Sequence, residues 1–329
     1  MSRDACHGSS SLTRHFRHIG SCRRFAFASL RAALAFAVSA TAAIDVASAQ
    51  DIEPRSYSNA PIGVNFLIAG YGYTQGGVPT DSLPVTNPHL DTSNMIFAYA
   101  RSLDLWGKSA KFDVIVPYTW LSGSASDAGR PVERVVNGFS NPSFRLSINL
   151  CGAPALALKD FSGYQQDLIV GASLQVSAPW GQYDGSRLIN IGTNRWFFKP
   201  EMGISKAFGA WTLEGAAAVT LYTDNADFYG GNNRTQDPLY SVQGHIIYSF
   251  RNGVWASADA TWFAGGRTTL NGTLSNDLQQ NWRIGGTLAL PIDRYNSIKL
   301  AASSGVSART GNSFDLLALA WQHRWGGGF

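Results

Sequence analysis

Cysteine is nearly absent from this chain, which has three in 329 residues. Two of them, Cys6 and Cys22, lie in an N-terminal segment that we expect to be cleaved off, so only Cys151 remains. A single cysteine excludes an intramolecular disulfide and a cysteine-based metal site in the mature protein. Cys151 follows the strand-like Leu150, and we interpret it as a small apolar residue rather than a nucleophile.

Long hydrophobic runs are also missing after residue 49. No apolar stretch there approaches the roughly 18 residues that a membrane-spanning helix requires, which excludes an α-helical membrane protein. Charged residues make up 15% of the chain and hydrophobic residues 45%, a balance that fits one large folded domain or two.

The excess of positive charge is confined to the N-terminus. Residues 1–49 hold six arginines and two aspartates, and this net +4 equals the formal charge of the whole chain. Of the 26 basic and 22 acidic residues in total, 20 of each remain after residue 49. The basic balance therefore does not indicate a nucleic-acid partner.

The N-terminus has the three parts of a secretory signal peptide. Several arginines precede an apolar stretch at 32–44, and small residues at 47–49 provide a cleavage site. An amphipathic helix of the folded domain is the alternative. Because the part before Arg23 is long for a signal, a start site further along the chain also stays open.

We therefore divide the chain into three parts. Residues 1–49 are predicted to be a signal peptide cleaved after Ala49, and residues 50–61 a periplasmic N-terminal segment. Whether residues 50–61 or residues 151–166 plug the lumen stays open. Residues 62–329 are predicted to form the folded domain.

That domain alternates between apolar and polar residues. Between residues 195 and 206, even positions include Trp196 and Met202, whereas odd positions include Lys199 and Glu201. A period of two indicates extended strands. Segments of about ten residues match the length that a tilted strand needs to cross a bilayer. The pattern predicts an all-β fold, an antiparallel transmembrane β-barrel.

Twelve strands are predicted, an even number that places both termini in the periplasm. They cover residues 62–73, 93–105, 110–120, 141–150, 167–178, 195–207, 211–222, 239–250, 254–264, 280–291, 298–309 and 314–325. Short and long connections alternate, as expected for periplasmic turns and extracellular loops.

Some connections and strands break this regularity. The 151–166 connection is long for a turn and could form a small helix or a plug, and the external connection at 310–313 is unusually short. Pro117 and Pro200 lie inside strands, where each removes a hydrogen-bond donor, and they predict bulges.

Aromatic residues gather near the strand ends, as in the girdles at the two membrane surfaces. Packing between the sheets of a sandwich is the alternative. The predicted girdle residues are Trp120, Trp196, Trp211, Trp262, Trp282, Trp325, Tyr73, Tyr118, Tyr222 and Tyr248.

Charged side chains within the strands must face a lumen, since a charge near the midplane of the lipid face costs roughly 2–4 kcal/mol. We predict either an ionic lattice that stiffens the barrel or a pore wall that contacts solute. On the second strand, we place Arg101 inward beside an aromatic patch. The candidates are Arg101, Asp113, Arg145, Lys199, Glu201, Glu214, His245, Asp259, Arg283 and Lys299.

Enzymatic chemistry has little support. The chain has three histidines after residue 49, and only His245, with Ser241 or Ser249, resembles part of a hydrolase triad. We therefore predict no catalytic residues, no cofactor and no metal. A calcium ion held by aspartates of the 223–238 loop is a minor alternative.

Several motifs in order resemble the outer-membrane family named for the meta-pathway of phenol degradation. They begin with Trp106-Gly107-Lys108, Pro117-Tyr118 and Asn141-Pro142, followed by the residues at 181–184, 190–196, 199–201, 223–225, 236–240 and 255–259. Together they span most of residues 60–325. The resemblance implies a barrel that moves aromatic or other small hydrophobic compounds.

Within these motifs, Asn190, Asn194 and Arg195 form the end of an external loop. The amide side chains of the two asparagines can satisfy loop backbone groups, and all three residues could also line a pore mouth.

The sequence thus predicts a passive channel in the outer membrane of a Gram-negative bacterium, for small aromatic or hydrophobic compounds. Its expected partners are outer-membrane lipid, the solute and, during biogenesis, the barrel-assembly machinery. Two alternatives remain: a structural or adhesive barrel whose external loops bind a partner, and an outer-membrane enzyme acting on lipid.

Overall fold

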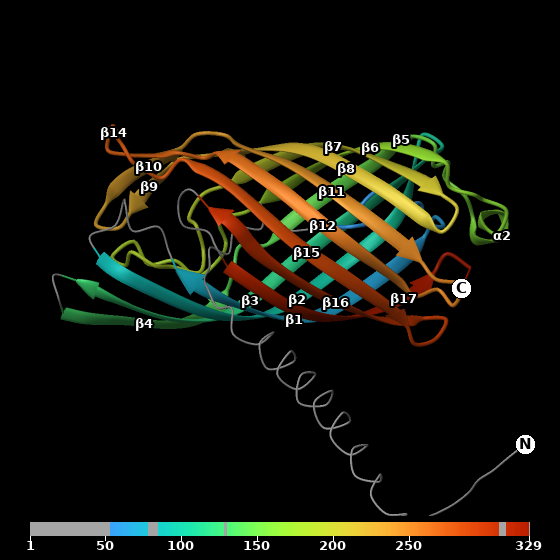
Figure 1. The fold of residues 1–329 in the computed structure, drawn as a ribbon. Coiled ribbons are helices and arrows are strands. Elements are labelled where there is room, and N and C mark those ends of the chain that lie inside the picture. Colours follow the sequence, from blue (N-terminus) through green and yellow to red (C-terminus); the bar gives the residue numbers. More distant parts are fainter. Residues whose placement is uncertain (1–52, 78–84, 128–129, 309–313, 329) are drawn as a thin grey trace, which may run out of the picture. The chain divides into compact units, whose positions relative to one another are not determined.

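A closed cylinder of twelve antiparallel strands forms the body of the protein in the computed structural model (Figure 1). The structure describes residues 53–77, 85–127, 130–308 and 314–328. In order around the barrel the strands are β1 (Val64–Gly77), β2 (Val85–Leu105), β3 (Lys108–Asp127), β5 (Ser143–Cys151), β6 (Leu168–Ser177), β7 (Phe197–Phe208), β8 (Trp211–Tyr222), β11 (Leu239–Ser249), β12 (Trp255–Gly265), β15 (Gln279–Pro291), β16 (Asn296–Ala308) and β17 (Phe314–Gly326).

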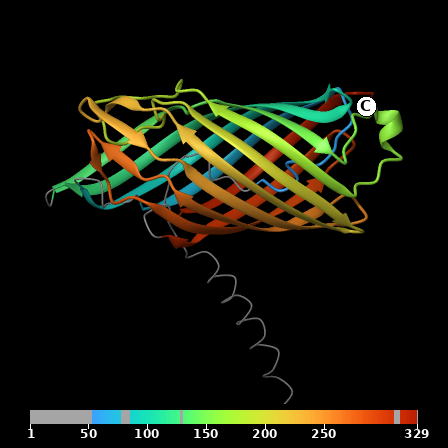
Figure 2. The same ribbon diagram turned by 90° about the horizontal axis from the view of Figure 1, so that it is seen from above.

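Closure occurs between the first and last strands, where Val64 of β1 pairs with Gly326 of β17. Figures 1 and 2 show the strands tilted along the cylinder. The twelve strands predicted from the sequence are confirmed, and each overlaps its observed counterpart.

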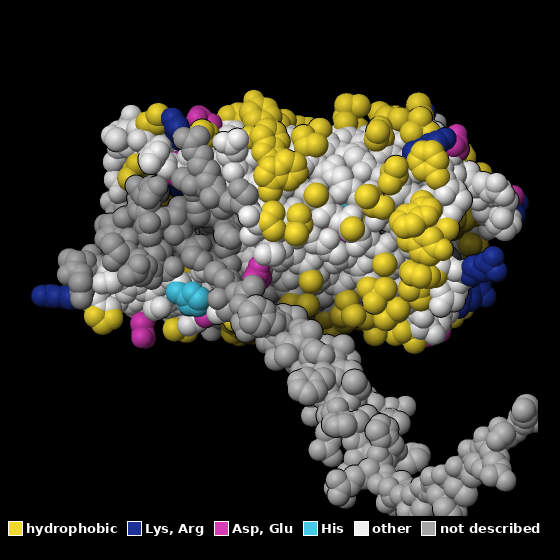
Figure 3. Space-filling view, in the orientation of Figure 1, with side chains coloured by type: hydrophobic (Ala, Val, Ile, Leu, Met, Phe, Trp, Pro, Cys, Tyr) yellow, Lys and Arg dark blue, Asp and Glu magenta, His cyan; other side chains and the backbone are white. Residues whose placement is uncertain are grey.

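The two faces of each strand are chemically different, as the alternating sequence requires. On β7, Lys199 and Glu201 are buried in the interior, whereas the next residue, Met202, is 60% exposed on the outside. Figure 3 shows hydrophobic side chains spread over the outer surface of the barrel. This outer face is suited to hydrocarbon, and the charged groups are kept away from it.

The two ends of the barrel differ. Short turns such as 106–107 and 209–210 gather at one end, here called the turn end, together with the described C-terminus and helix α2 (Leu158–Phe161) (Figure 1). The opposite end, the loop end, carries the long connections. No helix in the described ranges is long and apolar enough to cross a membrane.

At the loop end, two connections build a small four-stranded sheet outside the barrel. Its strands are β9 (Asn225–Phe228), β10 (Asn232–Gln236), β13 (Thr268–Leu270) and β14 (Thr273–Leu274). Strand β4 (Arg130–Phe139) pairs with β3 and lengthens that side of the barrel.

The two prolines do not form the predicted bulges. Strand β3 pairs with β5 at residues 110–115 and with β4 at 118–127, so Pro117 marks the place where β3 changes partner. Pro200 stays in register with Leu174, while the β7–β8 ladder skips residues 199–200 without a register shift. Each proline therefore occupies a position where a backbone donor is not required.

Rings near the strand ends follow the predicted girdles, with one exception. At the turn end, the rings of Trp211 and Tyr248 lie 4.7 Å apart, and at the loop end those of Tyr118 and Trp120 also lie 4.7 Å apart. Tyr222 was predicted to join a girdle, but it pairs with Phe197 on the inner face. Its side chain therefore belongs to the lumen.

A charge placed on the outer face tests this arrangement. Met202→Arg is expected to lower the free energy of unfolding from liposomes by roughly 2–4 kcal/mol, because the guanidinium would lie in hydrocarbon. Met202→Leu is the matched control and should change stability little. Urea unfolding followed by tryptophan fluorescence measures both, and equal stability of the two variants would contradict a lipid-facing Met202.

Candidate solute pathway through the barrel

The lumen has two chemically distinct walls. Strands β3 to β15 present most of the charged and amide side chains, which we call the charged wall. Strands β16, β17, β1 and β2 present mostly small and apolar side chains along their middle part, which we call the apolar wall, with Lys299 and Gln322 nearer the turn end and Thr74, Thr92 and Asn94 nearer the loop end. By register, the apolar wall consists of Ala301, Leu316, Ala318, Ala320, Phe66, Ile68, Gly70, Gly72, Ile96, Ala98 and Ala100.

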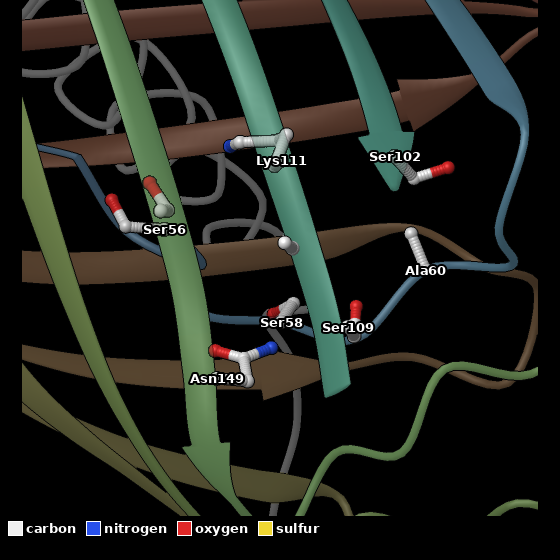
Figure 4. A pocket seen from close by; sticks show the side chains of 9 residues that line it. Ser56, Ser58, Ala60, Ser102, Ser109, Lys111 and Asn149 are labelled. Atoms are coloured by element: carbon white, nitrogen blue, oxygen red, sulfur yellow. The ribbon is translucent and has the colours of Figure 1, made fainter. Parts of the chain in front are cut away.

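Residues before the first strand enter the lumen and bind the charged wall. Of the two plugs that the sequence left open, the structure shows the one formed before β1: residues 53–61, which we call the plug segment, lie between the strands (Figure 4). Its side chains contact strands from β5 to β12, and its Pro61 carbonyl accepts a hydrogen bond from Ser102 of β2.

Glu53 begins the plug segment and pairs with Arg145 of β5. Arg145 also donates from Nε to Asp113 Oδ2 over 3.1 Å, and Lys111 Nζ lies 3.7 Å from Asp113 Oδ1. Burial raises the pKa of the Glu53 carboxyl, but attraction by Arg145 and Lys199 outweighs burial and lowers that pKa to about 2. Glu53 is therefore ionised at neutral pH.

Tyr57 is the most deeply buried contact of the plug segment, at 4% exposed. Its hydroxyl donates to Glu201 Oε1 over 2.9 Å. Its ring lies directly on Gly171 and Gly203, where an added Cβ would come within 2.2 Å of ring carbons in both cases. These two glycines leave the space that the ring occupies.

Glu201 contacts Tyr57 through one carboxylate oxygen and the wall through the other. Its Oε2 accepts a hydrogen bond from Gln243 Nε2 over 3.2 Å and lies 3.7 Å from Lys199 Nζ. Tyr57 therefore binds a carboxylate that two neighbouring side chains already hold in place.

Arg55 provides a third attachment. Its backbone N–H donates to Glu214 Oε2 over 2.7 Å, and its guanidinium donates to Ser249 Oγ over 2.6 Å. The same guanidinium lies 5.0 Å above the Trp255 ring. Ser205 donates to the other oxygen of Glu214 over 2.8 Å, so both oxygens of this carboxylate are used.

His245 forms a buried pair with Asp259, with 2.7 Å between Nδ1 and Oδ1. Asp259 Oδ2 accepts from Ser257 over 3.0 Å. Among the described contacts, neither candidate serine bonds to His245, and Ser249 accepts from Arg55 instead. The arrangement fits a hydrogen-bonded wall better than a hydrolase triad.

Two further predicted lumen cations, Arg283 and Lys299, lie on the inner faces of β15 and β16. Arg283 donates from Nη2 to the Phe314 carbonyl over 2.6 Å, and its guanidinium lies 3.4 Å from the Phe314 ring centroid. Lys299 is opposite Ala289 and Ala320 on the inner face near the turn end, where it is exposed.

Arg101 is not in the lumen, and the prediction for it is wrong. Ala100 is opposite the buried Asp113, so Arg101 and its partner Phe112 point outward. The error has a physical cause: β2 contributes to the apolar wall, so both of its faces carry apolar residues and the alternation gives no signal. The other predicted lumen side chains all lie on the inner face, and their contact with a solute stays a prediction.

The predicted pore-mouth residues stabilise the connections at the loop end. Asn190 Oδ1 accepts from the backbone of Asp184 over 2.9 Å, and Asn194 donates to Asn225 Oδ1 over 2.9 Å. Arg195 binds Gln236 and lies 4.4 Å from the Tyr222 ring centroid. The loop that they hold packs Ile191 against the inward Leu90 and Leu121, which adds apolar surface at the loop end.

A small polar cavity lies beside the plug segment at the turn end. It has a volume of about 20 Å³, enough for about one water molecule. Figure 4 shows Ser56 and Ser58 of the plug segment facing strand residues that include Lys111 and Asn149.

No group of three or more acidic, histidine or cysteine side chains suited to a metal ion occurs within the described ranges. The long 151–166 connection carries α2 at the turn end and is not the plug. The sequence left open whether residues 50–61 or 151–166 plug the lumen, because residues 53–61 have no strand or helix periodicity and the side-chain partners of Glu53 and Arg55 lie 92 to 194 positions away.

The chain is similar in structure to known outer-membrane proteins. An outer membrane channel from Pseudomonas putida F1 matches with a TM-score of 0.68 and 18% identity, covering 84% of this chain and all of that one. The transport unit of the Escherichia coli autotransporter AIDA-I matches with a TM-score of 0.51 and 10% identity, covering 84% and 93%. At these identities the likeness shows the barrel fold.

No curated protein matches the chain in sequence. A family profile with the description "Putative MetA-pathway of phenol degradation" matches residues 70–322, most of the barrel. The resemblance seen in the sequence motifs is thereby confirmed, and the chain belongs to this family.

Proposed function

We propose that the protein is a passive outer-membrane channel for small aromatic or amphipathic compounds, and that it works without covalent chemistry or a cofactor. One observation carries the proposal: along its middle part the lumen has an apolar wall facing a charged wall, so a solute with one apolar and one polar side can contact both. Membership of a family described by phenol degradation supports the aromatic class.

The plug segment controls how much of this pathway is open. Its recorded side-chain contacts with the wall go to the charged side, through Glu53, Arg55 and Tyr57. Twelve strands enclose a narrow interior, between small filled barrels and open porins of 16–18 strands. Occupation of the lumen by a peptide therefore limits passage strongly.

We further propose that the turn end lies in the periplasm and the loop end outside the cell. Short periplasmic turns and long external loops are the usual arrangement in bacterial barrels. In that orientation the plug segment enters from the periplasmic side.

Loosening the plug segment should increase permeability. In liposome-swelling assays, Gly203→Val is expected to raise solute flux several-fold, because the new side chain occupies the place of the Tyr57 ring. Tyr57→Ala should do the same without altering the wall. Gly215→Val, on the outer face of β8 with its nearest neighbour 3.8 Å from the added Cβ, is the matched control.

The solutes should be phenyl β-glucoside and glucose, which differ by one aromatic ring. Faster flux of the phenyl compound is expected, because only its ring gains from the apolar wall. Equal exclusion of both solutes by the wild type and by the loosened variants would contradict the channel.

Acid should weaken the ion pair between Glu53 and Arg145. Since the pKa of Glu53 is lowered from 4.5 to about 2 in the folded protein, its stabilising contribution is complete above pH 4.5 and is lost as the pH falls toward 2. Conductance in planar bilayers should stay constant from pH 7 to 4.5 and rise below it. Glu53→Gln should show raised conductance already at pH 7, and an unchanged value there would argue against this role of the ion pair.

The orientation can be tested with Cys151, the exposed last residue of β5 at the turn end. A membrane-impermeant maleimide should not label it in intact cells but should label it once the outer membrane is permeabilised. Ser124→Cys in a Cys151→Ser background places the thiol at the loop end, where intact cells should be labelled. The reverse pattern would invert the proposed orientation.

A further inference from the structure

Arg101 is an exposed cation on the lipid face of β2. Its cross-strand neighbours are Asn65 on β1 and Phe112 on β3. Within the described part of the chain its side chain makes no hydrogen bond or ion pair. A guanidinium offers five N–H donors, and the described residues accept from none of them here.

Another outward cation is treated differently. Lys206 points outward near the turn end of β7, where it pairs with Asp167 and lies 5.7 Å from the Phe208 ring centroid. Arg101 has apolar neighbours instead: Phe97 and Phe112 are both exposed on the same face. Lys206 thus has a carboxylate partner within the barrel, whereas Arg101 has no anionic partner among the described residues.

The depth of Arg101 is set by the rings beside it. The Tyr99 ring lies 6.3 Å from that of Trp325, and the rings of Trp325 and His323 stack 5.8 Å apart. Such aromatic belts lie at the level of lipid headgroups. A basic residue costs roughly 0–1 kcal/mol at that level, against roughly 2–4 kcal/mol at the midplane.

The same place is where the barrel closes. Asn65 donates from Nδ2 to the Trp325 carbonyl over 3.3 Å and accepts from the Tyr99 hydroxyl over 2.6 Å. These bonds lie next to the Val64–Gly326 pair and join β17, β1 and β2. A molecule bound at Arg101 would therefore rest against three strands at the closing seam.

We propose that Arg101, framed by Tyr99, Phe112 and Trp325, is a binding site for the phosphate headgroup of an anionic phospholipid in the leaflet at the turn end. The guanidinium fork matches a phosphodiester in two parallel hydrogen bonds. The acyl chains then lie along the exposed Phe97 and Met95. The proposal rests on the membrane location of the barrel and not on the identity of its solute.

The test uses the purified full-length mature protein in a neutral detergent, titrated with phosphatidylglycerol or phosphatidylcholine. Native mass spectrometry counts bound lipid, and tryptophan fluorescence gives the Tm. Phosphatidylglycerol should bind the wild type and raise its Tm, whereas phosphatidylcholine should do so weakly. Inorganic phosphate should leave the Tm unchanged, because it lacks the chains that hold the headgroup at this depth.

The decisive variant is Arg101→Gln, which should bind phosphatidylglycerol roughly ten-fold or more weakly, since charge-assisted hydrogen bonds are lost. Arg101→Lys should fall between the two, because it keeps the charge without the fork. Lys206→Gln is the matched control and should bind as the wild type does. Wild-type affinity in Arg101→Gln, or no preference for phosphatidylglycerol in the wild type, would overturn the proposal.

Liposome swelling separates this result from the proposed function. Arg101 lies outside the lumen, so Arg101→Gln should keep the wild-type swelling rate, which also shows that the variant is folded. Lost lipid binding with normal swelling supports the site. Normal lipid binding in a barrel impermeable to both phenyl β-glucoside and glucose would retain the site and reject the channel.

Discussion

The structure depends on one constraint: a strand that crosses hydrocarbon must pair all of its backbone N–H and C=O groups, and only a closed sheet provides this. Pairing of Val64 with Gly326 brings the first and last strands together and removes the two free edges. Closure also separates the faces of every strand, so alternating residues meet either lipid or the interior. The hydrophobic exterior and the charged interior are both consequences of this geometry.

What the interior does depends on how its side chains are distributed around the cylinder. Charges are gathered on one side, where Asp113, Arg145, Glu201 and Glu214 each have partners, while the opposite side carries alanine, glycine and leucine. The plug segment uses the charged side for ionic and hydrogen-bonded contacts. Its recognition by the wall is therefore polar, whereas the surface available for a hydrophobic solute lies across the lumen.

Much of the fold could be predicted because the alternation is strong wherever one face is charged, as on β7 with Lys199 and Met202. Prediction from the alternation failed on β2, because the lumen face with Ile96 and Ala98 is as apolar as a lipid face. Arg101 was therefore assigned to the wrong side. The sequence could name residues 50–61 as a possible plug but could not choose between them and residues 151–166, since the fit of Tyr57 onto Gly171 and Gly203 exists only after distant strands meet. Local sequence carries periodicity but not such long-range pairing.

The central claim is that residues before β1 occupy a pathway that would otherwise conduct. Single-channel conductance of the mature protein with and without residues 50–57 tests it most directly, because the deletion removes Glu53, Arg55 and Tyr57 and leaves every strand intact. The account predicts a clearly larger unitary conductance for the shortened protein, in a barrel with unchanged secondary structure. The same conductance in both proteins, with the shortened barrel correctly folded, would contradict it.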